Sequence, residues 1–184
     1  MKELVEEKFK EIFGTEGRFK TYFVPAKVNI VEEDEDYKGE MAPKTRAKKG
    51  VCATIRERED RILNFYSVNF SEAGIISISI DNVAYNENET WVKYPKEIIL
   101  SLKEEGYELK HGFDIVYYEN IVTDNRKDIL KILTAIVLKD MYNLDINNET
   151  IETLEQKTDE EDEEDLAEGI KILNFGPGHT FGMM

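Results

Sequence analysis

The chain is poor in the residues on which several kinds of site depend. Cys52 is the one cysteine among 184 residues, so a disulfide framework is excluded. The two histidines, His111 and His179, are far apart, and neither has a histidine or cysteine companion at metal-ligand spacing. The sequence therefore supports neither a zinc site nor a catalytic triad, and we predict no metal.

Long apolar runs and positive charge are also scarce. No apolar run approaches the roughly 18 residues of a membrane-spanning helix, and no charged-then-apolar leader opens the chain. Lysine and arginine number 24 against 39 aspartates and glutamates, which gives a net charge of -15. Such a field keeps a protein soluble and does not draw it to anionic membranes or bulk DNA. We therefore predict a cytoplasmic protein with no membrane partner.

The order of the apolar residues predicts an α+β fold. Residues 2–13 place Val5 and Phe9 on one helical face, and Gly14 is a candidate left-handed C-cap. A second helix is expected between Trp91 and Gly106, and a third over about 127–141, capped by Asp124 or Asn125 and apolar on most faces. Residues rich in β-branched and aromatic side chains predict successive antiparallel strands, with a turn at 58–61; these strands are 19–31, 51–56, 61–68 and 75–80, followed later by 113–118.

Residues 22–40 read YFVPAKVNIVEEDEDYKGE. This stretch resembles the sugar-binding signature of galactokinases, roughly F-x-P-G-R-V-N-L-I-G-E-H-T-D-Y-x-G. Residues 91–96 (WVKYPK), 112–114 (GFD) and 133–146 also resemble galactokinase segments. The resemblance covers the amino-terminal half of that family and implies a domain over residues 1–158, with the antiparallel sheet and packed helices of the amino-terminal part of the GHMP kinases.

The chain departs from the galactokinase pattern at the residues on which phosphoryl transfer depends. The family holds ATP phosphates on a glycine- and serine-rich loop, because small residues let backbone N–H groups approach the anion. The corresponding residues 122–128 (VTDNRKD) contain no glycine and two carboxylates, Asp124 and Asp128. The family's catalytic aspartate follows Gly-Ile-Met, and the nearest equivalent here, at residues 169–172, is Gly-Ile-Lys-Ile. We predict that galactokinase activity is absent and that no cofactor is bound.

The same comparison predicts weaker sugar recognition than in the galactokinases. The signature implies sugar contacts at Glu33, Asp34, Asp36 and Tyr37, but Asp34 replaces a histidine and removes a hydrogen-bond donor. A hydroxyl that is left badly paired in a buried site costs about 1–3 kcal/mol. Galactose binding is therefore expected to be weak or absent. The consecutive acids at 32–36 more often form a hydrated loop than a metal site.

The carboxy-terminal part is expected to form a separate segment. Residues 159–168 are predicted to be an acidic linker, and residues 169–184 a tail in which 170–175 return as an edge strand. Seven consecutive carboxylates repel one another and either serve solubility or mimic the phosphates of a nucleic acid. They are Asp159, Glu160, Glu161, Asp162, Glu163, Glu164 and Asp165.

Positive charge gathers in the first third of the chain, where it forms either a solvated strand surface or a patch that contacts phosphates. Tyr22, Phe23, Phe65 and Tyr66 lie among these cations and suit base stacking, although such residues are more often core. We predict that this basic hairpin face is the interaction surface. Its members are Arg18, Lys20, Lys27, Lys44, Arg46, Lys48, Lys49, Arg56, Arg58 and Arg61.

Three classes of function follow. The first is a binding protein that inhibits a basic nucleic-acid enzyme or its RNA complex, of the anti-CRISPR or anti-restriction type carried by mobile elements. This reading relies on a galactokinase-like scaffold without kinase residues and on the acidic charge, which speeds association with basic partners. The second is a galactose-sensing regulator or residual sugar kinase, and the third is an RNA-directed activity of the basic face. We favour the first.

Overall fold

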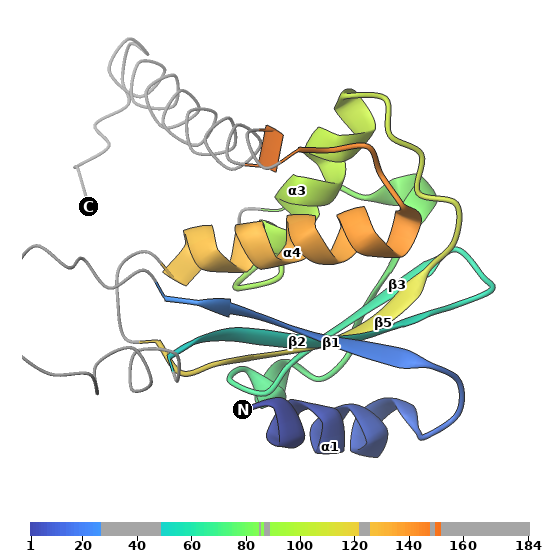
Figure 1. Cartoon of the computed structure of the whole chain (residues 1–184). Coiled ribbons are helices and arrows are strands. Elements are labelled where there is room, and N and C mark those ends of the chain that lie inside the picture. Colours follow the sequence, from blue (N-terminus) through green and yellow to red (C-terminus); the bar gives the residue numbers. More distant parts are fainter. Residues whose placement is uncertain (27–48, 85, 87–88, 122–125, 148–149, 152–184) are drawn as a thin grey trace, which may run out of the picture.

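The computed structural model describes residues 1–26, 49–84, 86, 89–121, 126–147 and 150–151. Its helices and strands form three layers, with one helix on one face of a sheet and two helices on the other (Figure 1). In chain order the elements are α1 (Lys2–Phe13), β1 (Phe19–Pro25), β2 (Gly50–Glu57), β3 (Ile62–Ser67), the 3-10 turn η2 (Ser71–Ala73), β4 (Ile76–Ser79), the 3-10 turn η3 (Ile80–Asn82), α3 (Lys93–Glu104), β5 (Phe113–Glu119) and α4 (Arg126–Tyr142).

The sheet has the strand order β1-β2-β5-β3-β4, so the predicted α+β class is confirmed. Three of the four pairings between described strands are antiparallel, as expected, but β3 and β5 are parallel. The turn at 58–61 joins β2 to β3, yet β5 lies between these two strands. A parallel pair needs a long crossover connection, and the segment that contains α3 supplies it. The pattern of residues within a strand does not say which strand will be its neighbour.

The first and last described helices have close to the predicted bounds. α1 ends at Phe13, and Gly14 follows with φ 81° and ψ 177°, while its N–H donates to the Lys10 carbonyl at 3.0 Å. Gly14 therefore is the C-cap with a positive φ, but its ψ lies outside the left-handed helical region and in one that glycine alone adopts easily. The caps proposed for α4, Asp124 and Asn125, lie outside the described residues.

The main core lies between the sheet and the helices α3 and α4. Odd-numbered residues of β2 and β5, such as Ile55 and Ile115, point into it, and α4 contributes Leu133 and Val137, which are fully buried. A smaller cluster under α1 contains Val5, Phe9, Cys52, Tyr66 and Val116. The side chains of one strand alternate between these two clusters because successive residues point to opposite faces of a sheet.

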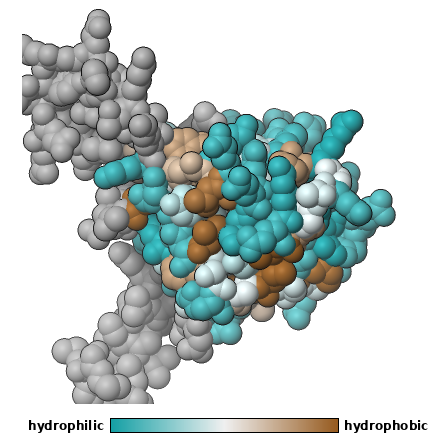
Figure 2. Space-filling model, turned by 90° about the horizontal axis from the view of Figure 1, so that it is seen from below, coloured by the Kyte–Doolittle hydropathy of each residue, from teal (hydrophilic) through white to brown (hydrophobic). Residues whose placement is uncertain are grey.

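Within the parts of the chain that the structure describes, no helix combines the length and the apolar character needed to cross a bilayer. Seen from the α1 side, the surface is largely hydrophilic, and its hydrophobic residues are separated by hydrophilic ones (Figure 2).

Candidate functional site

The predicted basic face is divided by the sheet. Arg56 on β2 is the register partner of Phe19, whereas Lys20 is the partner of Ile55, which belongs to the main core. Lys20 therefore points to the α4 side, where its Nζ lies 2.8 Å from Asp140 Oδ2. Arg56 points to the α1 side. Two cations of the predicted patch thus lie on opposite faces of the sheet.

Arg56 is held by α1 and by the sheet at the same time. Its guanidinium donates to the carbonyls of Phe13 at 2.9 Å and Glu16 at 2.7 Å, and it lies 5.3 Å from the centre of the Phe9 ring. The same group donates to Asp114 Oδ2 at 2.7 Å. Arg56 satisfies the carbonyl of the last residue of α1, which has no partner inside the helix, and that of Glu16 in the connection to β1. Its contacts fix α1 on the sheet.

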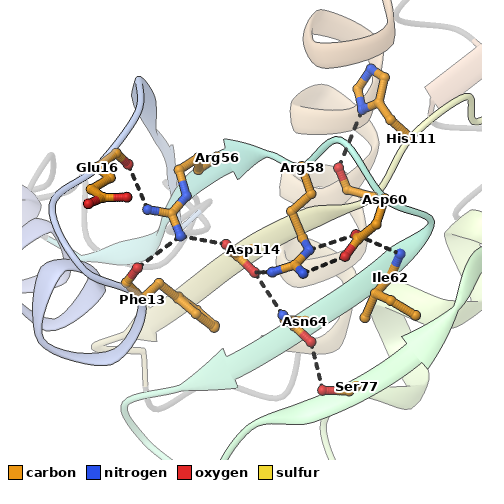
Figure 3. A network of polar contacts seen from close by, with 11 residues as sticks. Phe13, Glu16, Arg56, Arg58, Asp60, Ile62, Asn64, Ser77, His111 and Asp114 are labelled. Atoms are coloured by element: carbon orange, nitrogen blue, oxygen red, sulfur yellow. Dashed lines mark hydrogen bonds and ion pairs between the residues drawn. The ribbon is translucent and has the colours of Figure 1, made fainter.

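Asp114 on β5 is the centre of a polar network on the α1 side of the sheet (Figure 3). Its side chain is 1% exposed, and its Oδ1 accepts hydrogen bonds from Arg58 at 2.9 Å and from Asn64 Nδ2 at 2.8 Å. Arg58 also forms a two-point contact with Asp60, and Ser77 donates to Asn64. The hydrogen bond from Arg58 lowers the pKa of Asp60 to about 2. Ion pairs and hydrogen bonds of this network join β2, β3, β4 and β5.

The remaining cations of the patch have different surroundings. Arg61 pairs with Asp81 at 2.6 Å and donates to the Lys110 carbonyl at 3.2 Å. Arg18 and Lys49 are exposed. Lys27, Lys44, Arg46 and Lys48 lie outside the described residues, as do the sugar-site positions Glu33, Asp34, Asp36 and Tyr37 and the acidic run Asp159 to Asp165. The proposed stacking residues Phe65 and Tyr66 are buried, and so belong to the core.

A second polar group lies where β5 ends and α4 begins. The Glu119 carboxylate, at the end of β5, forms an ion pair with Arg126 at the first position of α4. The Arg126 guanidinium lies 4.8 Å from the centre of the Phe70 ring. Burial raises the pKa of Glu119, and the hydrogen bond and charge of Arg126 oppose that rise. This ion pair places a carboxylate beside the start of α4, which opposes the attraction that the first turn of a helix exerts on an anion.

The interior behind the start of α4 also contains charge. Lys131, which is fully buried, lies 3.1 Å from Glu97 Oε2 on α3, and Lys96 pairs with Glu89. Trp91 is 3% exposed, stacks on Phe70 with ring centres 6.5 Å apart, and has an indole N–H without a hydrogen-bond partner in the described structure. An ion pair is thus built into the core between α3 and α4.

The reactive side chains that the structure describes are buried or have structural partners. Among the described residues, no group of three or more His, Cys, Asp or Glu side chains could hold a metal ion. His111 contacts Glu57 at 2.8 Å and packs against Tyr142, so it is part of a structural contact. Burial raises the pKa of the Cys52 thiol to about 11, which keeps it protonated and poorly nucleophilic at neutral pH.

The sequence patterns did not identify Asp114 and Glu119, the two carboxylates that pair with arginines in these polar groups. At the sequence level, Asp114 was used only as part of a three-residue motif, and Glu119 was not named. The signal for Asp114 was a single aspartate within the otherwise apolar and aromatic strand FDIVYY. An ionised side chain in a buried strand requires partners of opposite charge, and Arg56 and Arg58 were available at the end of β2, three strands earlier in the sequence.

The comparisons with known proteins agree on one family. The chain is 34% identical to a galactokinase of Fusobacterium nucleatum over 142 residues, which are 76% of this chain and 36% of that protein. The solved galactokinase of Lactococcus lactis, in complex with galactose, matches with a TM-score of 0.72 and 30% identity over 86% of this chain and 42% of that one. A mevalonate kinase structure matches at 17% identity with a TM-score of 0.52 over 58% of this chain and 35% of that one, which shows the fold alone.

No family model matches the chain. The chain spans less than half the length of the relatives named above. Galactokinase and mevalonate kinase share the GHMP-kinase fold, so the fold predicted from the sequence is confirmed.

Proposed function

Since this chain is a homologue of the galactokinases with a GHMP-kinase fold, we propose that it is a binding protein that uses this scaffold without phosphoryl transfer and inhibits a nucleic-acid enzyme. The enzyme would be of the restriction or RNA-guided type, and the chain an inhibitor of the anti-restriction or anti-CRISPR kind. The proposed partner is a protein with a basic surface. A fold alone does not determine function, so the proposal rests on particular residues.

The absence of kinase activity is supported by the residues around the start of α4. Catalysis of phosphoryl transfer depends on cations and backbone N–H groups that neutralise the phosphates. Here Glu119 at the end of β5 pairs with Arg126, Asp128 lies in the first turn of α4, and the sequence before the helix adds Asp124. A bound phosphate would meet these carboxylates, and Arg126, the nearest described cation in sequence, is already paired with Glu119.

One observation supports this choice of partner: four cations of the predicted face, on β1, on β2 and in the turn at 58–61, are paired with carboxylates of the same chain. Lys20 pairs with Asp140, Arg56 and Arg58 with Asp114, and Arg61 with Asp81. Cations with internal partners contribute little to contacts with a phosphate backbone, which disfavours direct RNA binding by these strands. The net charge of -15 then acts on a basic protein surface and speeds association with it.

Nuclease inhibition tests the proposal directly. Cleavage of linear DNA by a panel of restriction endonucleases and RNA-guided nucleases is measured with and without the purified chain, at low and at high salt. The proposal expects inhibition of at least one enzyme that weakens as salt rises. Direct binding of the chain to the free DNA or guide RNA, with no binding to the enzyme, would instead support the RNA-directed alternative.

Two variants separate the candidate surfaces. In one, Lys44, Arg46, Lys48 and Lys49 are replaced by glutamate; in the other, the seven carboxylates of residues 159–165 are replaced by their amides. Loss of inhibition in the first variant assigns the basic hairpin, and loss in the second assigns the acidic run as a phosphate mimic. Each phosphate-like contact that is lost should lower the slope of log affinity against log salt by about one.

A calorimetric titration with ATP and magnesium tests the lack of kinase function. We expect no binding at micromolar concentrations, because the region offers carboxylates where phosphates would lie. Micromolar affinity, together with transfer of phosphate to galactose, would contradict the proposal.

The galactose-sensing alternative is favoured by one finding, namely that the Lactococcus lactis relative was solved with galactose. In this chain Glu33, Asp36 and Tyr37 keep the residue types of the sugar signature, and Asp34 does not. Saturation-transfer NMR with galactose, compared with an Asp36→Ala variant, distinguishes the two readings. Specific transfer that the variant abolishes supports the sensor, and its absence supports the inhibitor.

A further inference from the structure

The two edges of the described sheet differ in how they could accept another strand. β1 is an outer strand of seven residues, Phe19–Pro25. β4, at the other edge, has only four, and η2 with Gly74 precedes it while η3 follows directly. An outer strand presents a row of backbone N–H and C=O groups that can pair with a further strand. β1 therefore is the edge with room for a partner of typical strand length.

An apolar side chain on β1 is incompletely covered. Phe23 is 40% exposed, although it lies on the α1 side of the sheet, as the register partner of the buried Cys52. Its ring lies over Gly50, where an added Cβ would come 2.6 Å from Phe23 Cε2. The ring thus leans from β1 over β2, and a strand added at the outer edge of β1 could place a side chain against its exposed side.

The chain contains one segment that suits this edge. Residues 170–175, IKILNF, lie outside the described residues and are rich in apolar and β-branched types. Between Ile151 and Ile170 there are 18 residues, 152 to 169. Fully extended they reach about 60 Å, more than the diameter of about 40 Å expected for a domain of this size. The segment can therefore reach β1 from the end of the described chain.

The positions of charged residues favour one direction for a strand added beside β1. Lys49 is exposed, and its carbonyl accepts a hydrogen bond from the Ala26 N–H at 2.9 Å, so it lies at the Pro25 end of β1. The seven carboxylates of residues 159–165 precede Ile170 by four residues, 166 to 169. An antiparallel strand brings these carboxylates to the end of β1 where Lys49 lies, whereas a parallel strand brings them to the other end of β1.

We propose that residues 170–175 form a sixth strand, antiparallel to β1, on the free edge of the sheet. In the register that places Ile172 opposite Phe23, Asn174 lies opposite Thr21, so that apolar meets apolar and polar meets polar on the α1 side. The added strand protects the edge from pairing with other chains. This inference concerns the scaffold and does not depend on the identity of the inhibited enzyme.

Disulfide trapping in the full chain tests the pairing and the edge. In a Cys52→Ala background, Thr21→Cys is combined with Asn174→Cys, and a matched control combines Ser77→Cys on β4 with the same Asn174→Cys. A disulfide requires the two Cα atoms to approach within about 7 Å, so it forms only between close neighbours. We expect an intramolecular disulfide, seen by mass spectrometry, in the first variant and not in the control. A bond to residue 77, a bond between two copies, or no bond in either variant overturns the proposal.

Amide exchange provides a second measurement without new cysteines. In the wild-type chain, the N–H groups of β1 that point away from β2 should exchange slowly. Ile172→Pro removes a donor and disrupts the added strand, and should speed their exchange by about tenfold or more. The matched control, Ala167→Pro, lies outside the strand and should leave β1 unchanged. Fast exchange of these groups in the wild-type chain, or no difference between the two variants, overturns the proposal.

Discussion

The two faces of the same sheet are stabilised in different ways. On the α3 and α4 side, strand residues such as Leu63, Phe65 and Phe113 are fully buried against apolar helices. On the α1 side, the strand positions between them include Asn64 and Asp114, which belong to a network of hydrogen-bonded charges. Dispersion and the hydrophobic effect stabilise the first face. The second depends on the complete pairing of a buried carboxylate, so the loss of one partner should be costly there.

The largest effect is expected from a cavity on the apolar face. Phe113→Ala removes a fully buried ring that packs edge-on against Phe65 at 5.3 Å, and should lower the free energy of unfolding by about 3–5 kcal/mol. Urea denaturation followed by circular dichroism measures the change. Ile75→Ala, at a 48% exposed position just before β4, serves as the matched control and should cost about 1 kcal/mol or less. Equal losses in the two variants would show that the apolar face is not the dominant core.

Removal of the charge at the centre of the polar face should have a somewhat smaller effect. Asp114→Asn preserves the shape of the side chain but leaves Arg56 and Arg58 without their shared anion. We expect a loss of about 2–4 kcal/mol in the same denaturation experiment. Asp81→Asn, which removes the exposed partner of Arg61, is the control and should cost about 1 kcal/mol or less. A neutral result for Asp114→Asn would mean that the network contributes nothing to stability.

A series of unfolding measurements at different pH values tests the buried carboxylate of Glu119 beside the start of α4. Burial raises the pKa of Glu119 above its ordinary value of 4.5, with Arg126 opposing the rise. The folded state then binds the proton more tightly than the unfolded state, so this contribution to stability is present below 4.5 and is lost as the pH rises through the folded pKa. The free energy of unfolding of the wild type should fall relative to that of Glu119→Gln as the pH is raised from 4 toward 7, by no more than about 1.4 kcal/mol per pH unit. A constant difference between the two proteins would contradict this.

The smallest effect is expected at the exposed ion pair on the α4 side. The side chains of Lys20 and Asp140 are 67% and 48% exposed, and the Tyr22 hydroxyl also donates to Asp140. Lys20→Ala should therefore change the free energy of unfolding by less than about 1 kcal/mol, and the difference should vanish in high salt. Thermal denaturation at two salt concentrations measures it. A salt-independent loss would indicate that Lys20 acts through packing of its aliphatic stem.

Local sequence signals predicted the elements well but not their neighbours. The helix over 2–13 and the helix over about 127–141 match α1 and α4 closely, because each has an apolar stripe of helical period and clear end signals. The pairing of β3 with β5 was not predictable from these signals. Strand partners are chosen by connections and packing over long sequence separations, which the alternation within one strand does not encode.

The candidate site was predicted only in part, and for a related reason. Arg56, Arg58 and Lys20 were recognised as cations, but their side-chain directions depend on the register, which places Lys20 and Arg56 on opposite faces. Their carboxylate partners lie far away in the sequence; Asp114, for example, is separated from Arg56 by 58 residue numbers. Charge counted along the chain therefore overestimated the cations available for binding.

By itself the sequence determined the α+β class, the galactokinase-like segments and the strongly acidic charge. These properties follow from composition, periodicity and short motifs, which are local. Only the tertiary structure decided that Asp114 gathers two arginines, that Glu119 closes the start of α4 with Arg126, and that β1 is left as a long outer strand in the described sheet. Each of these depends on which strands lie side by side, because ion pairs and free edges arise from contacts between residues distant in the chain.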